Sequence, residues 1–270
     1  MKKRLDCILE KLRLAPSRLR QLWADKGFRK KIISISSVAL VVALAVVCAA
    51  IYLGDYYRAD STEIGAFAPM KSVAVDTSRD GVAVALAENA EVGLIFYPGG
   101  KVEYTAYLPL MAACAERGIL AAVVEMPFNL AVLDMNAADG IRELYPEIER
   151  WYIGGHSLGG SMAASYVAKN SEDFSGLVLL GSYSTADISL LGISVLSLYG
   201  SADGIMNREN YEKYSSNLPA GFDEIVIDGA NHAGFGMYGD QDGDGAASIS
   251  HAEQIIVAAD YIAKFIFDGE

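Results

Sequence analysis

A run of 22 residues without a charge, IISISSVALVVALAVVCAAIYL over residues 32–53, divides the chain into two unequal parts. As an α-helix this run would be about 33 Å long, which is enough to cross the hydrocarbon core of a bilayer. Basic residues lie directly before it, and tyrosines lie at its other end: Arg29, Lys30 and Lys31, then Tyr52, Tyr56 and Tyr57. The run therefore predicts a single transmembrane helix.

The charges are distributed unequally on the two sides of this run. Residues 1–31 carry 11 Lys and Arg against 3 Asp and Glu, a net of +8, whereas the remainder carries 11 basic and 31 acidic residues, a net of −20. Basic residues beside a span favour the cytoplasmic side. We predict a basic cytoplasmic tail (1–31), a transmembrane signal anchor (32–53), a linker (54–70) and a folded domain outside the cytoplasm (71–270). An acidic domain is a poor match for nucleic acid, and we expect no such partner.

Three other interpretations of the apolar run are weaker. A signal peptide cleaved after Ala49 would have an unusually long polar lead, and a lipoprotein site at Cys48 would lack the small residue expected before it. A buried helix of a soluble protein fits neither the length nor the one-sided charge. Beyond the run, Cys114 is the single cysteine, which excludes a disulfide within the outer domain and a cysteine-based metal site.

Short apolar runs alternate with helical stretches over the rest of the chain. We predict eight strands at 72–77, 81–87, 92–97, 120–126, 150–155, 175–181, 194–199 and 223–229. Helices are expected at 104–117, 129–145, 158–170, 207–217 and 251–267. The first two strands are close enough to form a hairpin, and the later ones are short and rich in Val, Ile and Leu. This alternation predicts an α/β fold with a doubly wound, mostly parallel eight-stranded sheet.

The connection between the sixth and seventh predicted strands is short. Its sequence, SYSTADISLLGI, has only 12 residues. In doubly wound sheets the reactive loops leave the carboxyl ends of the strands, and insertions there can cover the site. We expect no lid domain at this connection, so the site should be open on that side.

A nucleophile-like turn lies between the fifth predicted strand and the helix after it. Gly155-His156-Ser157-Leu158-Gly159 has the form G-x-S-x-G, the nucleophile elbow, in which a serine stands on a sharp strand-to-helix turn. The glycines at positions 155 and 159 are needed because a Cβ would clash where the chain doubles back. The pattern and its context predict that Ser157 is a nucleophile.

A serine nucleophile needs a base, and the chain has three histidines. His156 adjoins Ser157, and its ring is expected to point away from the hydroxyl. His251 falls in the first turn of a helix, behind a capping box made by Ser250 and Glu253. His232 follows the eighth strand on a glycine-rich loop at the carboxyl edge, and it is the predicted base.

The acid that orients the base should lie between the serine and the histidine in the chain. Asp203 directly follows the seventh strand and is the preferred residue. Asp187, in the short sixth connection, would serve only if the acid had moved one strand earlier. Asp228 lies at the end of the eighth strand, too near His232 in sequence to be the preferred partner.

Two backbone N–H groups are expected to form the oxyanion hole. One belongs to Leu158, the residue after the nucleophile, and the other comes from the loop after the third strand. That loop is YPGGKVEY, whose glycines let the amides turn toward the site. Gly100 is the predicted second donor, with Lys101 as the alternative.

These motifs together resemble the α/β-hydrolase superfamily, and more closely its small lidless group termed α/β-hydrolase fold-5. The resemblance rests on FYPGGKVEYTAYLPLMAACAERG, GGHSLGGSMA, LYGSADG and GANHAGFGMYG, and it covers residues 72–265. It implies a Ser157–Asp203–His232 triad. Related dienelactone hydrolases use a cysteine nucleophile, so the serine in this chain argues against that substrate.

A calcium-binding interpretation competes for one acidic segment. In DQDGDGAASISH, Asp240, Asp242 and Asp244 occupy positions 1, 3 and 5 of an EF-hand loop, with Gly245 at position 6. His251 stands at position 12, where a bidentate Glu is expected, and no helix precedes the loop. We favour an acidic surface turn and predict no metal site, with calcium-dependent adhesion as the alternative.

The sequence thus predicts a membrane-anchored, extracytoplasmic serine hydrolase that needs no cofactor. Its expected partners are the lipid bilayer, through residues 32–53, and a small-molecule or cell-envelope substrate. A carboxylic ester is the expected substrate, with thioesterase, amidase or acyltransferase activity as alternatives. A non-catalytic cell-surface binding module on the same fold is disfavoured, because a decayed site usually loses one triad member.

Overall fold

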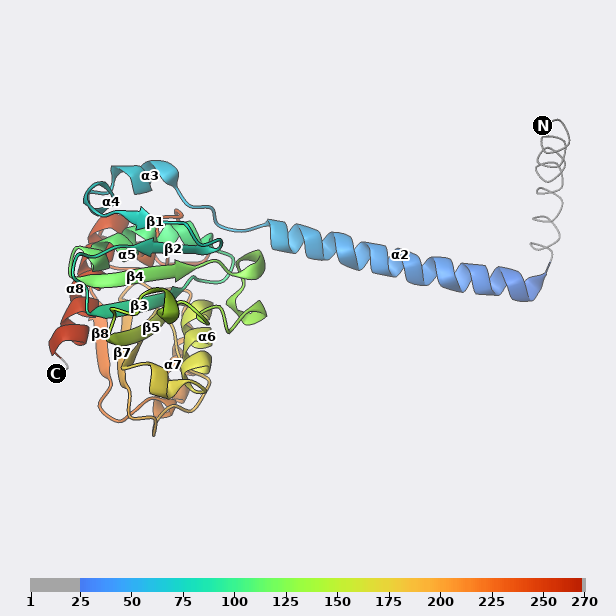
Figure 1. Cartoon of the computed structure of the whole chain (residues 1–270). Coiled ribbons are helices and arrows are strands. Elements are labelled where there is room, and N and C mark those ends of the chain that lie inside the picture. The colour runs from blue at the N-terminus through green and yellow to red at the C-terminus, as the bar shows by residue number, and fades with distance from the viewer. Residues whose placement is uncertain (1–24, 269–270) are drawn as a thin grey trace, which may run out of the picture. The chain divides into compact units, whose positions relative to one another are not determined.

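A computed structural model describes residues 25–268 of the chain, whose two compact units are Met1–Asp55 and Tyr56–Glu270. The first unit contains helix α2, which spans Lys26–Gly54 (Figure 1). Asp25 caps its start, and the Asp25 side chain accepts a 2.7 Å hydrogen bond from the Gly27 N–H. Within residues 25–268 it is the one helix long and apolar enough to cross a membrane, a test that a signal sequence also passes. The predicted basic tail lies mostly outside the described residues.

The second unit is built on one eight-stranded sheet (Figure 1). The strands are β1 (Val75–Asp76), β2 (Val82–Ala85), β3 (Val92–Tyr97), β4 (Ile119–Val124), β5 (Arg150–His156), β6 (Gly176–Leu180), β7 (Ser194–Gly200) and β8 (Asp223–Ile227). Their order across the sheet is β1-β2-β4-β3-β5-β6-β7-β8. β1 and β2 form the predicted antiparallel hairpin, β2 is antiparallel to β4, and all further pairs are parallel. The predicted eight-stranded, mostly parallel sheet is confirmed.

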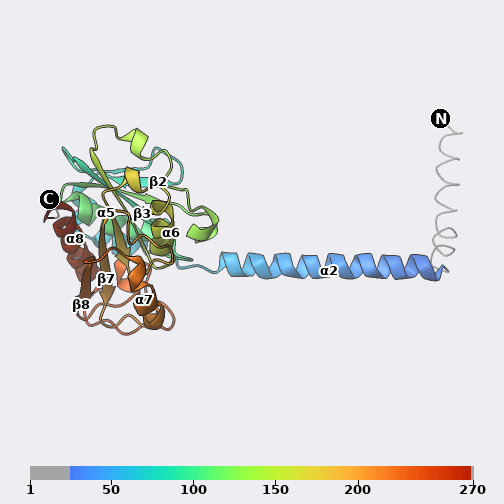
Figure 2. The same cartoon turned by 90° about the horizontal axis from the view of Figure 1, so that it is seen from below.

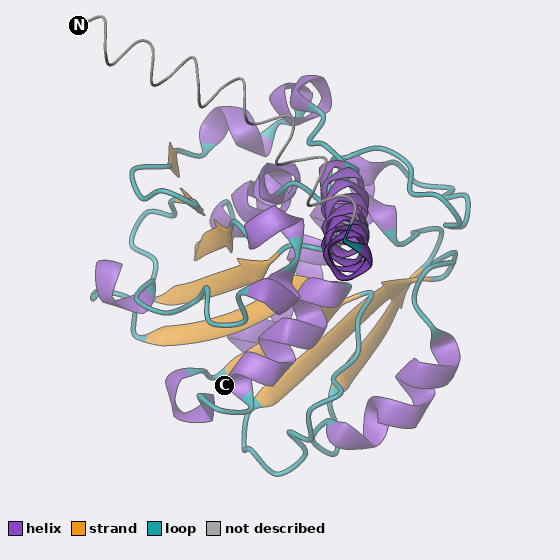
Figure 3. Cartoon of the chain, turned by 90° about the vertical axis from the view of Figure 1, so that its right-hand side faces the viewer, coloured by secondary structure: helices purple, strands orange, loops and turns teal. Residues whose placement is uncertain are grey.

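Helices cover both faces of the sheet, as Figures 2 and 3 show. The helices that cover the two faces are α5 (Leu108–Ala115), α6 (Leu158–Val167), α7 (Arg208–Tyr214) and α8 (His251–Asp268). Side chains of a strand alternate between faces. Thus Leu94 and Phe96 of β3 pack in the cluster that holds α5 and α8, whereas Ile95 and Tyr97 pack in the cluster that holds α6. Burial of both faces explains why β3, β4 and β6 contain no charged residue.

The predicted helix over 129–145 is wrong. The structure has three short 3₁₀ turns in its place, at Pro127–Asn129, Ala131–Leu133 and Arg142–Leu144. Tertiary contact decides the conformation: the Tyr97 hydroxyl donates to Met135 O (2.7 Å) and accepts from the Ala138 N–H (3.0 Å). Backbone groups held by a strand residue cannot form an α-helical ladder.

The segment predicted to be a linker, 54–70, contains helix α3 (Ser61–Ala66) and the start of α4 (Pro69–Ser72). Asp60 caps α3 by accepting hydrogen bonds from the N–H groups of Thr62 and Glu63. The DSTE pattern at 60–63 is a local helix-start signal that the sequence analysis did not use. Because α4 extends to Ser72, the predicted strand at 72–77 shortens to β1.

Candidate active site

The sheet reverses its winding between β3 and β5, which lie side by side while β4 lies on the far side of β3. In doubly wound sheets this switch point opens a crevice at the carboxyl ends of the strands. Gly100 follows β3, and Ser157 follows β5. The two parts of the predicted site, the oxyanion loop and the nucleophile elbow, therefore meet at the position where topology favours a ligand.

Ser157 has the strained backbone of a nucleophile elbow. Its φ of 52° and ψ of −121° are rare for a residue with a side chain. The turn is held in place because the Ser157 N–H donates to Leu180 O (2.9 Å), while the Ser182 hydroxyl donates to Ser157 O (2.7 Å). Strain at a residue that the surroundings fix this firmly indicates a functional position.

The glycines of the elbow leave no room for side chains. A Cβ on Gly155 would lie 2.5 Å from the Gly159 carbonyl carbon. A Cβ on Gly159 would collide with the carbonyl oxygens of Tyr97 and Pro98 at the end of β3. Both glycines are thus required for helix α6 to start directly against the sheet.

We expect Gly159→Ala to lower the free energy of unfolding by about 3 kcal/mol or more, because the added Cβ meets backbone that cannot rotate away. For a chain of this size that corresponds to a fall in Tm of about 6 °C or more, measured on the detergent-solubilised chain. Gly65→Ala is the control, since a Cβ there has nothing within 4 Å. Equal Tm values for the two variants would contradict the argument.

Asp203 and His232 form a buried pair. His232 Nδ1 lies 2.8 Å from Asp203 Oδ2, and the two side chains are 1% and 0% exposed. Asp203 Oδ1 accepts the N–H groups of Ile205 (2.9 Å) and Met206 (2.8 Å). Burial raises the pKa of Asp203, but His232 and these N–H groups outweigh it and hold the pKa below its ordinary value. The carboxylate is therefore ionised at neutral pH and fixes the orientation of the imidazole.

The other nitrogen of the His232 ring is buried and has no hydrogen-bond partner within residues 25–268. A buried ring nitrogen without a partner requires an explanation. In a general base it is the atom that takes the proton of the nucleophile. No Ser157–His232 hydrogen bond is closed in the described part of the chain, which is common in unliganded sites.

The rival acids lie elsewhere. Asp187 is exposed and accepts hydrogen bonds from the Ser189 N–H and hydroxyl. Asp228 accepts a 3.3 Å hydrogen bond from the Ser201 hydroxyl. Of the three candidates, the one hydrogen-bonded to His232 is Asp203.

His156 supports the back of His232, a role that the sequence analysis did not foresee. The two rings are 4.4 Å apart at their centroids, and His156 Nδ1 is 2.7 Å from the Tyr107 hydroxyl oxygen. That hydroxyl also accepts the Gly99 N–H (3.1 Å). Burial, and then the proximity of His232, hold the pKa of His156 well below its ordinary value. A neutral His156 adds no repulsion when His232 gains a proton.

Two of the three candidate N–H donors of the oxyanion hole remain after the structure is considered. The Lys101 N–H donates to Asn129 O (2.7 Å), so it is engaged, and Gly100 is left as the donor from this loop. Within the described residues the N–H groups of Gly100 and Leu158 donate to no protein acceptor. A Cβ on Gly100 would be 3.0 Å from the Leu158 side chain, which places the two residues in contact. Both N–H groups are thus available to a developing oxyanion.

Asp244 ties together the loop that follows Asp203 and the loop that follows His232. Its Oδ1 accepts the N–H groups of Gly204 (3.0 Å) and Gly245 (2.8 Å), and its Oδ2 accepts the Ala233 N–H (2.8 Å). Gly204 and Ala233 are the residues after Asp203 and His232. Over residues 25–268 no three His, Cys, Asp or Glu side chains gather as a metal site would need. The connection is long-range, so local sequence carries no signal for it.

We expect Asp244→Asn to lower kcat/KM for an ester about 10- to 100-fold, because an amide group cannot accept all three N–H groups and the two loops shift. Asp242→Asn is the matched control, with the same charge change at an exposed position of the same segment. Steady-state kinetics on both variants checks this. Equal effects would indicate that charge, and not the clamp, matters.

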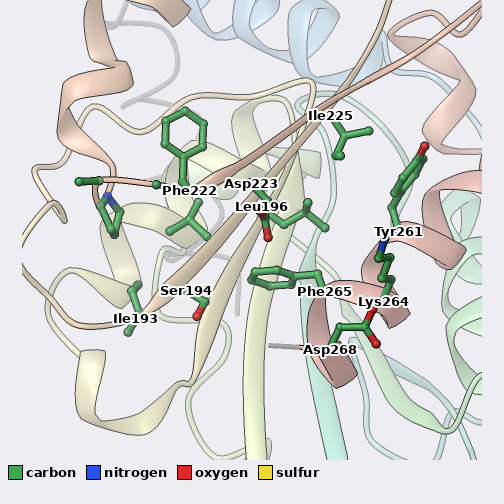
Figure 4. A pocket seen from close by; sticks show the side chains of 14 residues that line it. Ile193, Ser194, Leu196, Phe222, Asp223, Ile225, Tyr261, Lys264, Phe265 and Asp268 are labelled. Carbon is green, nitrogen blue, oxygen red and sulfur yellow. The ribbon is translucent and has the colours of Figure 1, made fainter. Parts of the chain in front are cut away.

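A cavity of about 250 Å³ opens beside Ser157. Its lining combines apolar and hydroxyl side chains: Ser157, Leu158, Ser161, Ser182, Tyr183, Ile205, Met206 and Asn207, with Gly181. A separate cavity of about 380 Å³ lies at the opposite edge of the sheet, where Ser194 and Asp223 begin β7 and β8; Phe222, Tyr261 and Phe265 line it (Figure 4). Of these two cavities, the smaller one is lined by Ser157 and is therefore the candidate substrate site.

The fold and this edge of the sheet define the class of the molecule, an α/β hydrolase. A family model described as the alpha/beta hydrolase family matches residues 93–256, and the chain belongs to that family. The predicted resemblance is confirmed. No curated protein sequence matches the chain.

Solved structures match much of the chain at low sequence identity. Est1E from Butyrivibrio proteoclasticus is 12% identical, with 72% of this chain and 98% of that chain covered and a TM-score of 0.51. A bacterial membrane phospholipase A is 12% identical, with coverages of 87% and 98% and a TM-score of 0.55. A soluble variant of monoglyceride lipase from Saccharomyces cerevisiae is 12% identical, with coverages of 72% and 94% and a TM-score of 0.51. At such identity these likenesses establish the fold.

Proposed function

We propose that the protein is a serine ester hydrolase whose triad is Ser157, His232 and Asp203. The observation that carries the proposal is the buried His232 ring, held by Asp203 at 2.8 Å through one nitrogen while the other has no hydrogen-bond partner among the described residues. Such an imidazole is prepared to accept a proton, and the strained elbow serine stands at the same edge of the sheet.

The reaction follows from these positions. Ser157 Oγ attacks the acyl carbonyl carbon while His232 takes its proton, and the N–H groups of Gly100 and Leu158 stabilise the oxyanion. The tetrahedral intermediate then collapses as the bond between its carbon and the alcohol oxygen breaks. His232 gives the proton to that oxygen, so an alcohol leaves and the acyl group stays on Ser157 as the acyl-enzyme. Water, deprotonated by His232, cleaves the acyl-enzyme to a carboxylic acid and restores Ser157. No step in this sequence requires a cofactor.

We propose further that α2 anchors this hydrolase in a membrane, with the basic tail in the cytoplasm and the catalytic unit outside. The charge-free run over 32–53, the basic residues at 29–31 and the tyrosines after it support this orientation. The names of two similar solved structures, a membrane phospholipase A and a monoglyceride lipase, agree with an ester substrate.

A fluorophosphonate probe tests the catalytic proposal on the full chain in detergent. We expect covalent labelling at Ser157, located by peptide mass spectrometry, together with hydrolysis of a short p-nitrophenyl ester. A chain that takes no label and hydrolyses no ester would be a binding module on the same fold.

A further inference from the structure

We propose that the loop Pro127–Leu133 inserts into the bilayer surface beside the active site, so that the site takes its ester from the membrane. The inference rests on the proposed function and names its substrate class: an acyl ester that resides in a lipid bilayer. The loop follows β4, at the end to which the β4 arrow points (Figure 1).

The loop exposes apolar side chains that the fold does not cover. Phe128, Val132 and Leu133 are 62%, 57% and 55% exposed. From Met126 to Leu133, MPFNLAVL, the chain has no charge, and the acidic residues Glu125 and Asp134 bound the run. Neighbouring exposed apolar side chains on a soluble surface usually mark a binding surface.

The backbone of the loop is held in an uncommon conformation. Phe128 and Asn129 have φ values of 54° and 57°, in the left-handed region that residues with side chains rarely adopt. The buried Ala131 fixes the loop from below, in the cluster that also holds α6. The structure therefore presents the Phe128 side chain outward at a conformational cost.

The loop contacts the oxyanion loop directly. Asn129 O accepts the Lys101 N–H at 2.7 Å, and Lys101 follows the candidate donor Gly100. A bilayer that received Phe128 would therefore lie beside the mouth of the site.

The segment after α2 is joined to the same loop. The Tyr57 N–H donates to Lys101 O (2.8 Å), and Tyr57 O accepts the Glu103 N–H (2.9 Å). The Asp60 N–H donates to Met237 O (2.9 Å), on the segment that follows His232. The chain enters the catalytic unit on the two loops that carry the candidate oxyanion donor and the base.

The few residues between α2 and Tyr57 limit the distance between the end of this helix and Tyr57. Gly54 ends α2, and Tyr57 comes three residues later, which extended chain can span over about 10 Å at most. If α2 is the proposed span, the bilayer surface lies within that reach of Tyr57, and hence close to Lys101 and Asn129. An acidic domain has no electrostatic attraction to anionic lipid, so apolar insertion is the interaction that this surface offers.

A fluorescent probe on the loop tests the docking on the full chain, reconstituted in phosphatidylcholine vesicles. The background carries Cys7→Ser and Cys48→Ala, while Cys114 is buried and stays. An NBD label on Phe128→Cys should emit at shorter wavelength and be quenched by spin-labelled lipid. The control label on Leu190→Cys, at a position 94% exposed on another loop, should do neither.

Matching emission from the two labels would overturn the proposal. A blue shift at position 128 without quenching by the labelled lipid would also overturn it, because it would place a protein, such as a second copy, on the loop.

Activity measured on two esters tests the substrate class. For each protein the rate on a long-chain ester in vesicles is divided by the rate on soluble p-nitrophenyl butyrate. In the double variant Phe128→Ser, Val132→Ser this ratio should fall about tenfold. The ratio should not change for Leu190→Ser. A constant ratio in the double variant would overturn the substrate class. If the wild type instead hydrolyses neither ester and takes no fluorophosphonate, the proposed function fails, while the NBD measurement still decides the docking.

Discussion

Ser157→Ala is expected to lower kcat/KM for a p-nitrophenyl ester by about 10⁴-fold or more and to abolish fluorophosphonate labelling. In the proposed mechanism the hydroxyl oxygen forms the acyl-enzyme, and alanine has no group that can replace it. The fold should persist, because alanine keeps the Cβ and the elbow is held by backbone groups: the Ser157 N–H on Leu180 O and Ser157 O on the Ser182 hydroxyl.

Ser165→Ala is the matched control for this result. Ser165 lies on α6, two turns beyond the elbow, and its hydroxyl donates to Ser161 O within the same helix. We expect its activity and labelling to match the wild type. Full labelling of Ser157→Ala would show that another residue reacts with the probe and would end the triad proposal.

The sequence contains most of the information for the sheet, because its elements are specified locally. β3 matches its predicted range over 92–97, and the other strands from β4 onward differ from prediction at their ends by one or two residues. β3, β4 and β6 are short apolar runs, and burial on both faces leaves such a run few alternatives.

What the sequence could not predict depends on contacts between distant residues. The 129–145 segment has helix-like apolar spacing, but the Tyr97 hydroxyl and the left-handed Phe128 and Asn129 impose turns on it. Likewise, the sequence does not show that the Asp244 carboxylate joins the residues that follow Asp203 and His232. Contacts among three segments that are distant in the sequence leave no periodic pattern of residues from which they could be predicted.

The candidate site falls between these cases. Its order along the chain, Ser157, Asp203, His232, follows from strand ends and is visible in the sequence. The contacts that support the His232 ring are not visible in the sequence, because they involve three different elements, which contain His156, Tyr107 and Gly99. The choice between Gly100 and Lys101 also needed the structure, since it depends on a hydrogen bond to Asn129.

Asp203→Asn is the second change for which we expect a very large effect, a fall in kcat of about 10⁴-fold at neutral pH. Because the ionised Asp203 can only accept a hydrogen bond at Oδ2, the proton of His232 stays on Nδ1 and the other ring nitrogen can act as a base. An amide presents an N–H₂ group there while its oxygen still accepts the N–H groups of Ile205 and Met206. The ring is then held in the wrong tautomer although the loop keeps its shape. Asp187→Asn, at the exposed rival position, should leave kcat unchanged.

Asp203→Asn also tests whether Asp203 stabilises the fold, which is separate from its proposed role in catalysis. In the folded protein the pKa of Asp203 is below its ordinary value of 3.8, so the ionised carboxylate stabilises the fold fully above that value. This contribution is lost as the pH falls through the lower, folded-state pKa, because the folded and unfolded forms are then both protonated. The variant side chain does not titrate. We therefore expect the difference in unfolding free energy between wild type and Asp203→Asn to be largest at neutral pH and to shrink below pH about 4. Denaturant titrations of both chains at several pH values measure it, and a difference that grows in acid would mean that Asp203 is not ionised in the folded protein.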